Sequence, residues 1–256
     1  MSTDTRIETD TAATAPPAAA PPHVTTKFPR PSAEALRALG AYGSATIHEA
    51  QGRLGALDSR IKPVDHAMRF AGSAFTVVCA PRDNLMLQVA IHYARPGDVL
   101  LVSAGGMGQA GTFGDVLGNA AKAKGIAAVV TDSGVRDTEQ LRALGLPVFS
   151  TSVSITGTVK ETLGPLNQPM IIGGQLVHPG DAVVGDADGV VVVARDEIAR
   201  VTELSRRREE HEAELIERYK AGATTIELCG LTDVLPAKGL TTDLDADELG
   251  ASEAGR

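Results

Sequence analysis

Apolar runs alternate with helically spaced apolar positions in the middle of the chain. Continuous apolar stretches at 99–103, 126–131 and 146–149 are typical of strands buried on both faces. The segments between them, 115–125 and 137–145, begin with an aspartate and end with a glycine, which are helix start and stop signals. The alternation of strand and helix predicts βαβ units and a portion of parallel sheet.

The N-terminal half adds elements of the same kind. Ser32 precedes apolar residues at helical spacing and Gly40 follows them, so we expect a helix between the two. A second short helix is expected at 44–52, a strand at 69–80 and a helix at 84–94. The chain is therefore predicted to be an α/β protein.

The pattern changes in the C-terminal part. Short apolar runs between 170 and 193 are separated by turn sequences such as Gly173-Gly174, which predicts hairpins and hence a mixed sheet. A long helix is predicted at 196–221, and its middle, 206–214, is almost wholly charged. Such a segment leaves the core and meets either water or a neighbouring subunit.

Composition divides the chain into three parts. Residues 1–30 are rich in Ala, Pro and Thr, so we expect a disordered extension, followed by a single domain at 31–235 and a flexible acidic tail at 236–256. The extension lacks a continuous apolar signal segment, and no stretch approaches the roughly 20 apolar residues of a membrane span. We expect a cytoplasmic protein without a membrane partner.

Charge and side-chain chemistry narrow the function further. The net charge is −8, the isoelectric point is about 5.3 and no basic patch dominates, which argues against nucleic acid as a ligand. Aromatic residues make up only 3%, so the core must be largely aliphatic. The two cysteines, Cys79 and Cys229, lie far apart, as in proteins of a reducing cytosol.

The chemistry concentrates around a glycine-rich segment, 104–114, which we expect to be a loop. It matches neither a P-loop nor a well-placed dinucleotide fingerprint. Asp115 and Asp137 each follow a predicted strand at a helix start, where two carboxylates suit Mg²⁺ or Mn²⁺, and Arg136 could grip a carboxylate. The alternative is that both aspartates are ordinary helix N-caps, with Asp137 and Gln140 forming a capping box.

Several fragments together resemble one known family. They are Ser44-Ala45-Thr46-x-His48-Glu49-Ala50, Gly111-x-x-Gly114-Asp115-x-Leu117, Gly125-Ile126-Ala127-x-Val129, Asp132-x-Gly134-Val135-Arg136-Asp137, Gly157-Thr158-x-Lys160-x-Thr162-Leu163-Gly164 and Pro179-Gly180-Asp181 through Asp186-x-Asp188-Gly189-Val190. In this order, from about Leu39 to Leu231, they resemble class II pyruvate aldolases, which share a fold with the RraA regulators of ribonuclease E.

This resemblance implies a fold and an activity. The fold would be an RraA-like, swivelling β/β/α domain with a mixed sheet and βαβ units, assembled as a homotrimer or a dimer of trimers. The activity would be a divalent-metal-dependent retro-aldol cleavage that releases pyruvate from 4-hydroxy-4-methyl-2-oxoglutarate or 4-carboxy-4-hydroxy-2-oxoadipate. Oxaloacetate decarboxylation would be a side activity through the same enolate.

The resemblance also implies roles for individual residues. Asp137 would bind Mg²⁺ or Mn²⁺ directly, and Asp115 would bind it through water. Arg136 would hold the pyruvoyl carboxylate or the enolate. The helix start at Gly114, with the backbone amides of Val116 and Leu117, would help to hold the same carboxylate.

A further role is implied for the long helix. Glu212 would reach the metal through water from a neighbouring subunit, although Glu209, Glu210 or Glu214 could take its place and a solvated helix surface is the simpler interpretation. The segment Glu227–Gly230 departs from the family pattern at a region that shapes substrate recognition, so the substrate stays open.

Three other functions compete with this interpretation. One is a non-catalytic RraA-like regulator of ribonuclease E, and another is a lyase or dehydratase that acts on another hydroxy acid. The third is a Schiff-base aldolase, for which Lys122, Lys124 and Lys160 are the available amines, although none lies in an apolar strand that would depress its pKa.

Overall fold

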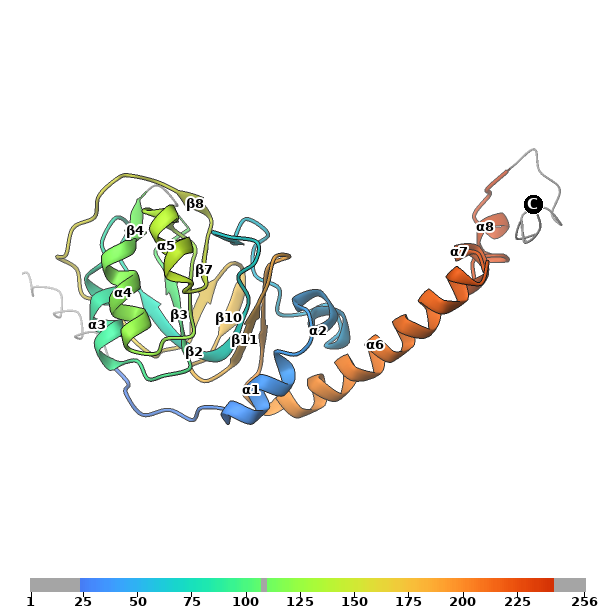
Figure 1. Cartoon of the computed structure of the whole chain (residues 1–256), viewed down its shortest axis with the longest axis horizontal. Coiled ribbons are helices and arrows are strands. Elements are labelled where there is room, and N and C mark those ends of the chain that lie inside the picture. The colour runs from blue at the N-terminus through green and yellow to red at the C-terminus, as the bar shows by residue number, and fades with distance from the viewer. Residues whose placement is uncertain (1–23, 107–109, 242–256) are drawn as a thin grey trace, which may run out of the picture.

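The computed structural model describes residues 24–106 and 110–241, and its centre is a seven-stranded mixed sheet (Figure 1). The strand order is β1-β7-β5-β3-β2-β11-β12, with two smaller sheets, β4-β6-β8 and β10-β9. The strands are β1 (Lys62–Pro63), β2 (Phe70–Val78), β3 (Asp98–Ser103), β4 (Gly111–Phe113), β5 (Ala128–Thr131), β6 (Gly134–Val135), β7 (Val148–Ser150), β8 (Ser152–Val153), β9 (Met170–Ile172), β10 (Gln175–Val177), β11 (Ala182–Gly185) and β12 (Val190–Val193). The helices are α1 (Ala33–Leu39), α2 (Ser44–Ala50), α3 (Leu85–Tyr93), α4 (Asp115–Ala123), α5 (Thr138–Leu144), the 3₁₀ turn η1 (Arg195–Glu197), α6 (Ile198–Lys220), α7 (Thr225–Leu228) and α8 (Val234–Ala237).

The predicted parallel portion of the sheet is confirmed. Strands β2, β3, β5 and β7 pair in parallel, while β11 and β12 add antiparallel strands at one edge. Helices α3, α4 and α5 lie together beside one face of the sheet (Figure 1). The mixed sheet with βαβ units that the sequence predicts is the observed architecture.

Burial on both faces explains the continuous apolar runs. Along β3, Leu100 and Val102 pack in the same core cluster as residues of α3 and α4, whereas Val99 and Leu101 pack in a second cluster with residues of the β9–β10 hairpin. All four side chains are at most 1% exposed. A strand covered on both sides cannot alternate apolar and polar residues, so it reads as a run.

One part of the predicted loop at 104–114 is a strand. Residues Gly111–Phe113 form β4, which pairs in parallel with β6, and β6 pairs in parallel with β8. The prediction of an uninterrupted loop is therefore wrong for these residues. A Cβ on Gly111 would lie 2.4 Å from the carbonyl oxygen of Ser154, so the close approach of the backbones requires a glycine where sequence patterns predict a loop.

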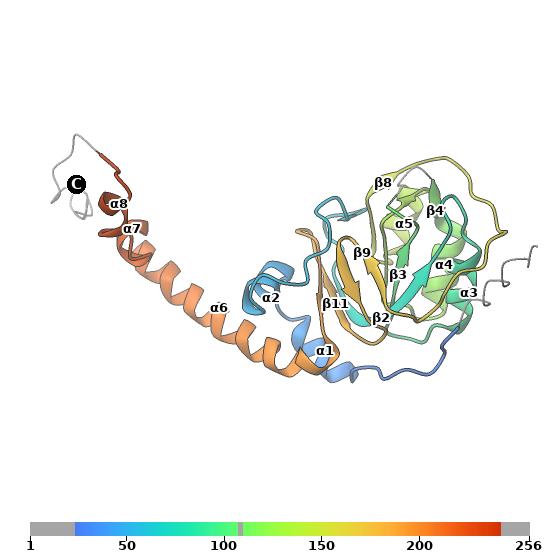
Figure 2. The same cartoon turned by 180° about the vertical axis from the view of Figure 1, so that it is seen from behind.

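The long predicted helix is present as α6. It packs against α1 and α2 and then runs away from the sheet (Figure 2). Its middle is held by ion pairs within the helix, including those of Arg206 with Glu203 and Glu210. None of the described helices is both long enough and apolar enough to cross a membrane. The predicted tail begins inside the described region, but residues 242–256 lie outside it.

Residues 24–30 differ from the predicted disordered extension. The guanidinium of Arg30 forms two hydrogen bonds with Asp98, of 2.7 and 2.9 Å, and it stacks 3.9 Å from the ring centre of Phe28. Phe28 in turn packs edge-on against Phe75 of β2. One aromatic ring and one arginine therefore anchor residues 24–30 to the domain. The average composition of residues 1–30 does not reveal two such anchoring residues. Residues 1–23 lie outside the described part of the chain.

Replacing Arg30 with methionine is expected to lower the free energy of unfolding by about 2 kcal/mol. The reason is that Asp98 is fully buried and would keep only the backbone N–H of Arg95, at 2.8 Å, as a donor. Urea unfolding followed by circular dichroism measures the change. The control is Arg37→Met, on the exposed face of α1, and equal midpoints for the two variants would contradict the expectation.

Candidate active site

The structure brings Asp115 and Asp137 together. The strands that directly precede them, β4 and β6, are parallel neighbours, so both chains turn into their helices at the same edge. The backbone N–H of Asp115 donates to Oδ2 of Asp137 over 3.1 Å. Two residues that are 22 positions apart therefore meet at the start of α4.

Gly114 makes this approach possible. A Cβ at this position would lie 2.4 Å from Oδ2 of Asp137 and 2.9 Å from Cγ of Arg136. Its φ is −157°, an extended conformation that any residue adopts, so the requirement for glycine is steric. The aspartate and the arginine therefore pack directly on the backbone of Gly114.

The helix-cap alternative does not describe either aspartate. Asp137 occupies the N-cap position of α5, but its side chain makes no capping hydrogen bond there, and its backbone is left-handed with φ 54° and ψ 43°. Its carboxylate accepts instead from the first turn of α4. Asp115 is the first residue of α4, and the N-cap is Gly114, which has no side chain. The alternative in which Asp137 and Gln140 form a capping box is therefore not what the structure has.

Arg136 lies beside Asp137 and is open to solvent. Its Nε is 3.6 Å from Oδ2 of Asp137, and the two side chains are 48% and 40% exposed. Its backbone N–H donates to the carbonyl of Phe113 over 2.9 Å, which continues the β4–β6 pairing. A fixed backbone and a half-exposed guanidinium leave Arg136 able to bind an anionic ligand.

The first turn of α4 contains Asp115, Val116 and Leu117. Oδ1 of Asp115 accepts a hydrogen bond from the side-chain amide of Asn119, one turn further along the helix, over 2.8 Å. Val116 is 79% exposed, and Leu117 is half-buried. The backbone N–H groups of Val116 and Leu117 belong to the first helical turn, which has no carbonyl partners within the helix. Unpaired N–H groups at a helix start are donors of the kind that bind anions.

Glu212 is not part of this arrangement within one chain. It lies on α6, which runs away from the sheet, whereas α4 and α5 lie on the other side of the molecule (Figures 1 and 2). Its carboxylate pairs with Arg208, one turn earlier, over 2.8 Å. Arg208 also approaches Glu49 of α2 at 3.8 Å.

The donor set suits a hard cation with few protein ligands. No group of three or more His, Cys, Asp or Glu side chains that could hold a metal occurs in the described ranges 24–106 and 110–241. Mg²⁺ is commonly held by one or two carboxylates, with water and substrate oxygens completing its shell. Asp137 and Asp115 offer oxygen ligands of the type that Mg²⁺ or Mn²⁺ prefers over Zn²⁺.

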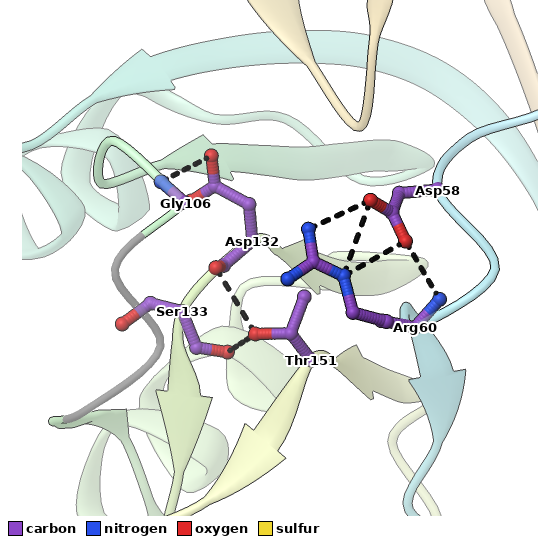
Figure 3. Close-up of polar contacts among 6 residues, drawn as sticks. All are labelled: Asp58, Arg60, Gly106, Asp132, Ser133 and Thr151. Atoms are coloured by element: carbon purple, nitrogen blue, oxygen red, sulfur yellow. Dashed lines mark hydrogen bonds and ion pairs between the residues drawn. The ribbon is translucent and has the colours of Figure 1, made fainter.

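A second feature was missed from the sequence. A cavity of about 280 Å³ lies at the carboxyl ends of β3, β5 and β7 (Figure 3). It is lined by Asp58, Arg60, Ile61, Ser103, Gly105, Gly106, Asp132, Thr151, Ile171, Gly173 and Gly174. Its residues come from five separate segments without a common pattern. Asp132 and the glycines of 104–114 and 173–174 stood in recognisable fragments, but none of them had an assigned role at this cavity.

Within this cavity an arginine is held in place by an aspartate. Arg60 donates to Asp58 through Nε and Nη2, the latter over 2.8 Å, and its guanidinium is directed toward Asp132 and Thr151 (Figure 3). The hydrogen bonds from the side chain and backbone of Arg60 lower the pKa of Asp58 from 3.8 to about 2. The pair therefore stays charged at neutral pH.

Comparisons with known proteins agree with this fold. The chain is 36% identical over 163 residues to a protein of Halalkalibacterium halodurans provisionally named a 4-hydroxy-4-methyl-2-oxoglutarate aldolase, covering 64% of this chain and 78% of the relative. A solved structure of Streptomyces coelicolor RraAS2, described as an unusual member of the RNase ES inhibitor RraA family, has a TM-score of 0.66 at 31% identity and covers 74% of this chain and 100% of its own. The solved structure of an uncharacterized Pseudomonas syringae pv. tomato protein has a TM-score of 0.67 at 28% identity, and the match covers 77% of this chain and 97% of that protein.

The family assignment rests on most of the domain. A model of the RraA-like family, Aldolase/RraA, matches residues 44–192. The matched range contains the sheet except for the last residue of β12, the turn with Gly114 and Asp115, and the Arg136–Asp137 pair. The chain belongs to the Aldolase/RraA family of RraA-like proteins.

Proposed function

We propose that this protein is a carbon–carbon lyase that releases pyruvate from a 4-hydroxy-2-oxo diacid by a divalent-metal-dependent retro-aldol reaction. The observation that carries the proposal is the turn at Gly114, where the carboxylate of Asp137 contacts the start of α4 beside a half-exposed Arg136. The candidate substrates are 4-carboxy-4-hydroxy-2-oxoadipate and 4-hydroxy-4-methyl-2-oxoglutarate. The aldolase name of the Halalkalibacterium relative supports this substrate class.

The protein's own groups divide the work. Asp137, with Asp115 acting through water, would hold Mg²⁺ or Mn²⁺. When bound, the dication would supply Lewis-acid stabilisation of the developing negative charge. Arg136 and the amides of Val116 and Leu117 bind the carboxylate of the pyruvoyl part, which orients the bond that breaks. Glu212 would contribute from a neighbouring subunit in a trimer or a dimer of trimers, because α6 points away from its own site (Figure 1).

The bond changes follow from this placement. Asp115, or a water molecule that it orients, accepts the proton of the C4 hydroxyl group. The C3–C4 bond then breaks, the C4 fragment leaves as a carbonyl compound, and its bonding electrons remain on the three-carbon part as the enolate of pyruvate. The guanidinium of Arg136 stabilises this charge, and water protonates the enolate. Oxaloacetate would lose CO₂ and leave the same enolate of pyruvate, so its decarboxylation is the expected side activity.

Two alternatives are less well supported by the geometry. A Schiff-base aldolase needs an amine with a depressed pKa, but Lys122, Lys124 and Lys160 are all exposed. A non-catalytic regulator is favoured by the likeness to RraAS2. A regulator has no need for an aspartate and an arginine packed on a glycine at a solvent-open helix start, so we favour the enzyme.

The proposal is tested by pyruvate release coupled to lactate dehydrogenase. We expect the full-length protein to release pyruvate from at least one of the two diacids, and more slowly from oxaloacetate, with Mg²⁺ or Mn²⁺ present. Chelation by EDTA is expected to lower the rate by about a hundredfold or more, and added Mg²⁺ to restore it. An undiminished rate in EDTA would contradict metal dependence, and trapping by borohydride in the presence of pyruvate would indicate the Schiff-base reaction instead.

A further inference from the structure

Asp132 connects the two segments that carry the proposed site. It directly follows β5 and is 7% exposed, and its carboxylate accepts three hydrogen bonds from the residues that end and follow β3. These are from Ser103 Oγ at 2.8 Å, from the N–H of Ala104 at 2.6 Å and from the N–H of Gly106 at 3.1 Å. The Gly106 contact is visible in Figure 3.

One of the residues that Asp132 holds, Gly106, belongs to a pair of glycines that follows the buried end of β3. Gly105 and Gly106 both have positive φ, of 77° and 67°, and neither carries a side chain that could pack. A glycine pair of this kind is conformationally free, so its path depends on the backbone hydrogen bonds that it makes. The backbone of Asp132 is itself tied to the end of β7, because Thr151 Oγ1 donates to its carbonyl over 3.0 Å.

From Ala110 onward, the chain is again bonded to the segment after β5. Ser133 Oγ donates to the carbonyl of Ala110, and Thr112 Oγ1 donates to that of Gly134. In the last two contacts, the N–H of Arg136 donates to the carbonyl of Phe113 and the N–H of Asp115 donates to Oδ2 of Asp137. Among the described residues, Asp132 therefore lies at one end of a series of contacts between 132–137 and the ranges 103–106 and 110–115, and the Asp115–Asp137 pair lies at the other end.

We propose that Asp132 is a positioning residue, which fixes the start of the segment after β5 against residues 103–106 at the end of β3 and thereby sets the place of Arg136 and Asp137 relative to Asp115. The effect of Asp132 on catalysis rests on the proposed function, whereas its effect on the position of Asp115, Arg136 and Asp137 does not. Only a carboxylate serves here, because both oxygens accept. An asparagine in either orientation turns its NH₂ group toward at least one N–H or O–H donor.

The test compares Asp132→Asn with Asp186→Asn by amide hydrogen exchange and mass spectrometry on the full chain. Asp186, which directly follows β11, is a matched control, since its carboxylate also accepts three hydrogen bonds, from the N–H and Oγ of Ser44 and from the N–H of Asp188. We expect the amides of Asp115 and Arg136 to exchange about tenfold faster in Asp132→Asn and at the wild-type rate in Asp186→Asn. Unchanged exchange in Asp132→Asn would overturn the proposal.

A milder variant covers the case in which Asp132→Asn fails to fold. Ser103→Ala removes one of the three donors and leaves the carboxylate, so it should speed exchange of the same two amides by a smaller factor. If Asp132→Asn does not fold, this variant decides, and wild-type exchange in Ser103→Ala overturns the proposal.

Mn²⁺ binding, followed by electron paramagnetic resonance, separates this inference from the proposed function. We expect Asp132→Asn to lower the affinity for Mn²⁺ about tenfold and Asp186→Asn to leave this affinity unchanged. A wild-type chain that binds no Mn²⁺ contradicts the metal centre, while the exchange data still decide the role of Asp132. Faster exchange with wild-type Mn²⁺ affinity would overturn the connection to the site.

Discussion

Replacing Asp137 with asparagine is expected to lower kcat/KM for pyruvate release by about a thousandfold. Asparagine keeps the size of the side chain, and it tolerates the left-handed backbone that Asp137 adopts at φ 54°. The change therefore removes the charge and one acceptor oxygen without straining the turn. Asp137→Ala should be at least as inactive, but it would combine this loss with backbone strain.

The measurement is the coupled pyruvate assay at saturating Mg²⁺, together with the melting temperature of each variant. Asp196→Asn, an exposed aspartate beside the start of α6, is the matched control and should keep wild-type activity. Because Asp137 is 40% exposed, its variant should melt close to the wild type. Activity of Asp137→Asn within threefold of the wild type, a factor of about 0.7 kcal/mol, would exclude this carboxylate from the reaction.

Adding a single methyl group at Gly114 is expected to lower kcat/KM by about a hundredfold, while stability changes by less than about 1 kcal/mol. The new Cβ of Gly114→Ala would lie 2.4 Å from Oδ2 of Asp137 and 2.9 Å from Cγ of Arg136, so both side chains must move. They are half-exposed and can do so cheaply. The backbone is extended, so alanine introduces no strain of its own.

Gly157→Ala is the matched control for this methyl group. A Cβ at Gly157 meets nothing within 4 Å, and the residue lies on the exposed segment after β8. We expect this variant to match the wild type in both activity and melting temperature. If Gly114→Ala also retained full activity, then the contact of Asp137 and Arg136 with this backbone would have no bearing on function.

The longer elements could be predicted because their signals are local. Ser32 caps α1, because its Oγ accepts a hydrogen bond from the N–H of Ala35. The apolar run at 99–103 forms a strand that is buried on both faces. The βαβ order then follows from alternation alone. The short strands β4, β6 and β8 could not be found this way. They have two or three residues each, and only their mutual pairing makes them strands.

The candidate site shows the same division. Asp115, Arg136 and Asp137 were identifiable from their positions after predicted strands and from the family fragments. Their geometry was not, because Asp137 has the sequence of a helix cap but directs its carboxylate to a different helix. Asp58 and Arg60 gave no signal at all, since they line a cavity whose other walls come from distant strands.

The sequence alone therefore determined the α/β class, the parallel core and the residue types that could hold a dication and a carboxylate. These properties follow from periodicity, from turn residues and from side-chain chemistry, which act over a few neighbouring positions. The tertiary structure alone decided that β4 and β6 lie side by side, that Gly114 admits Asp137, and that Asp132 joins the two segments. Such contacts depend on the fold as a whole, because they connect residues more than twenty positions apart through backbone geometry that no local pattern encodes.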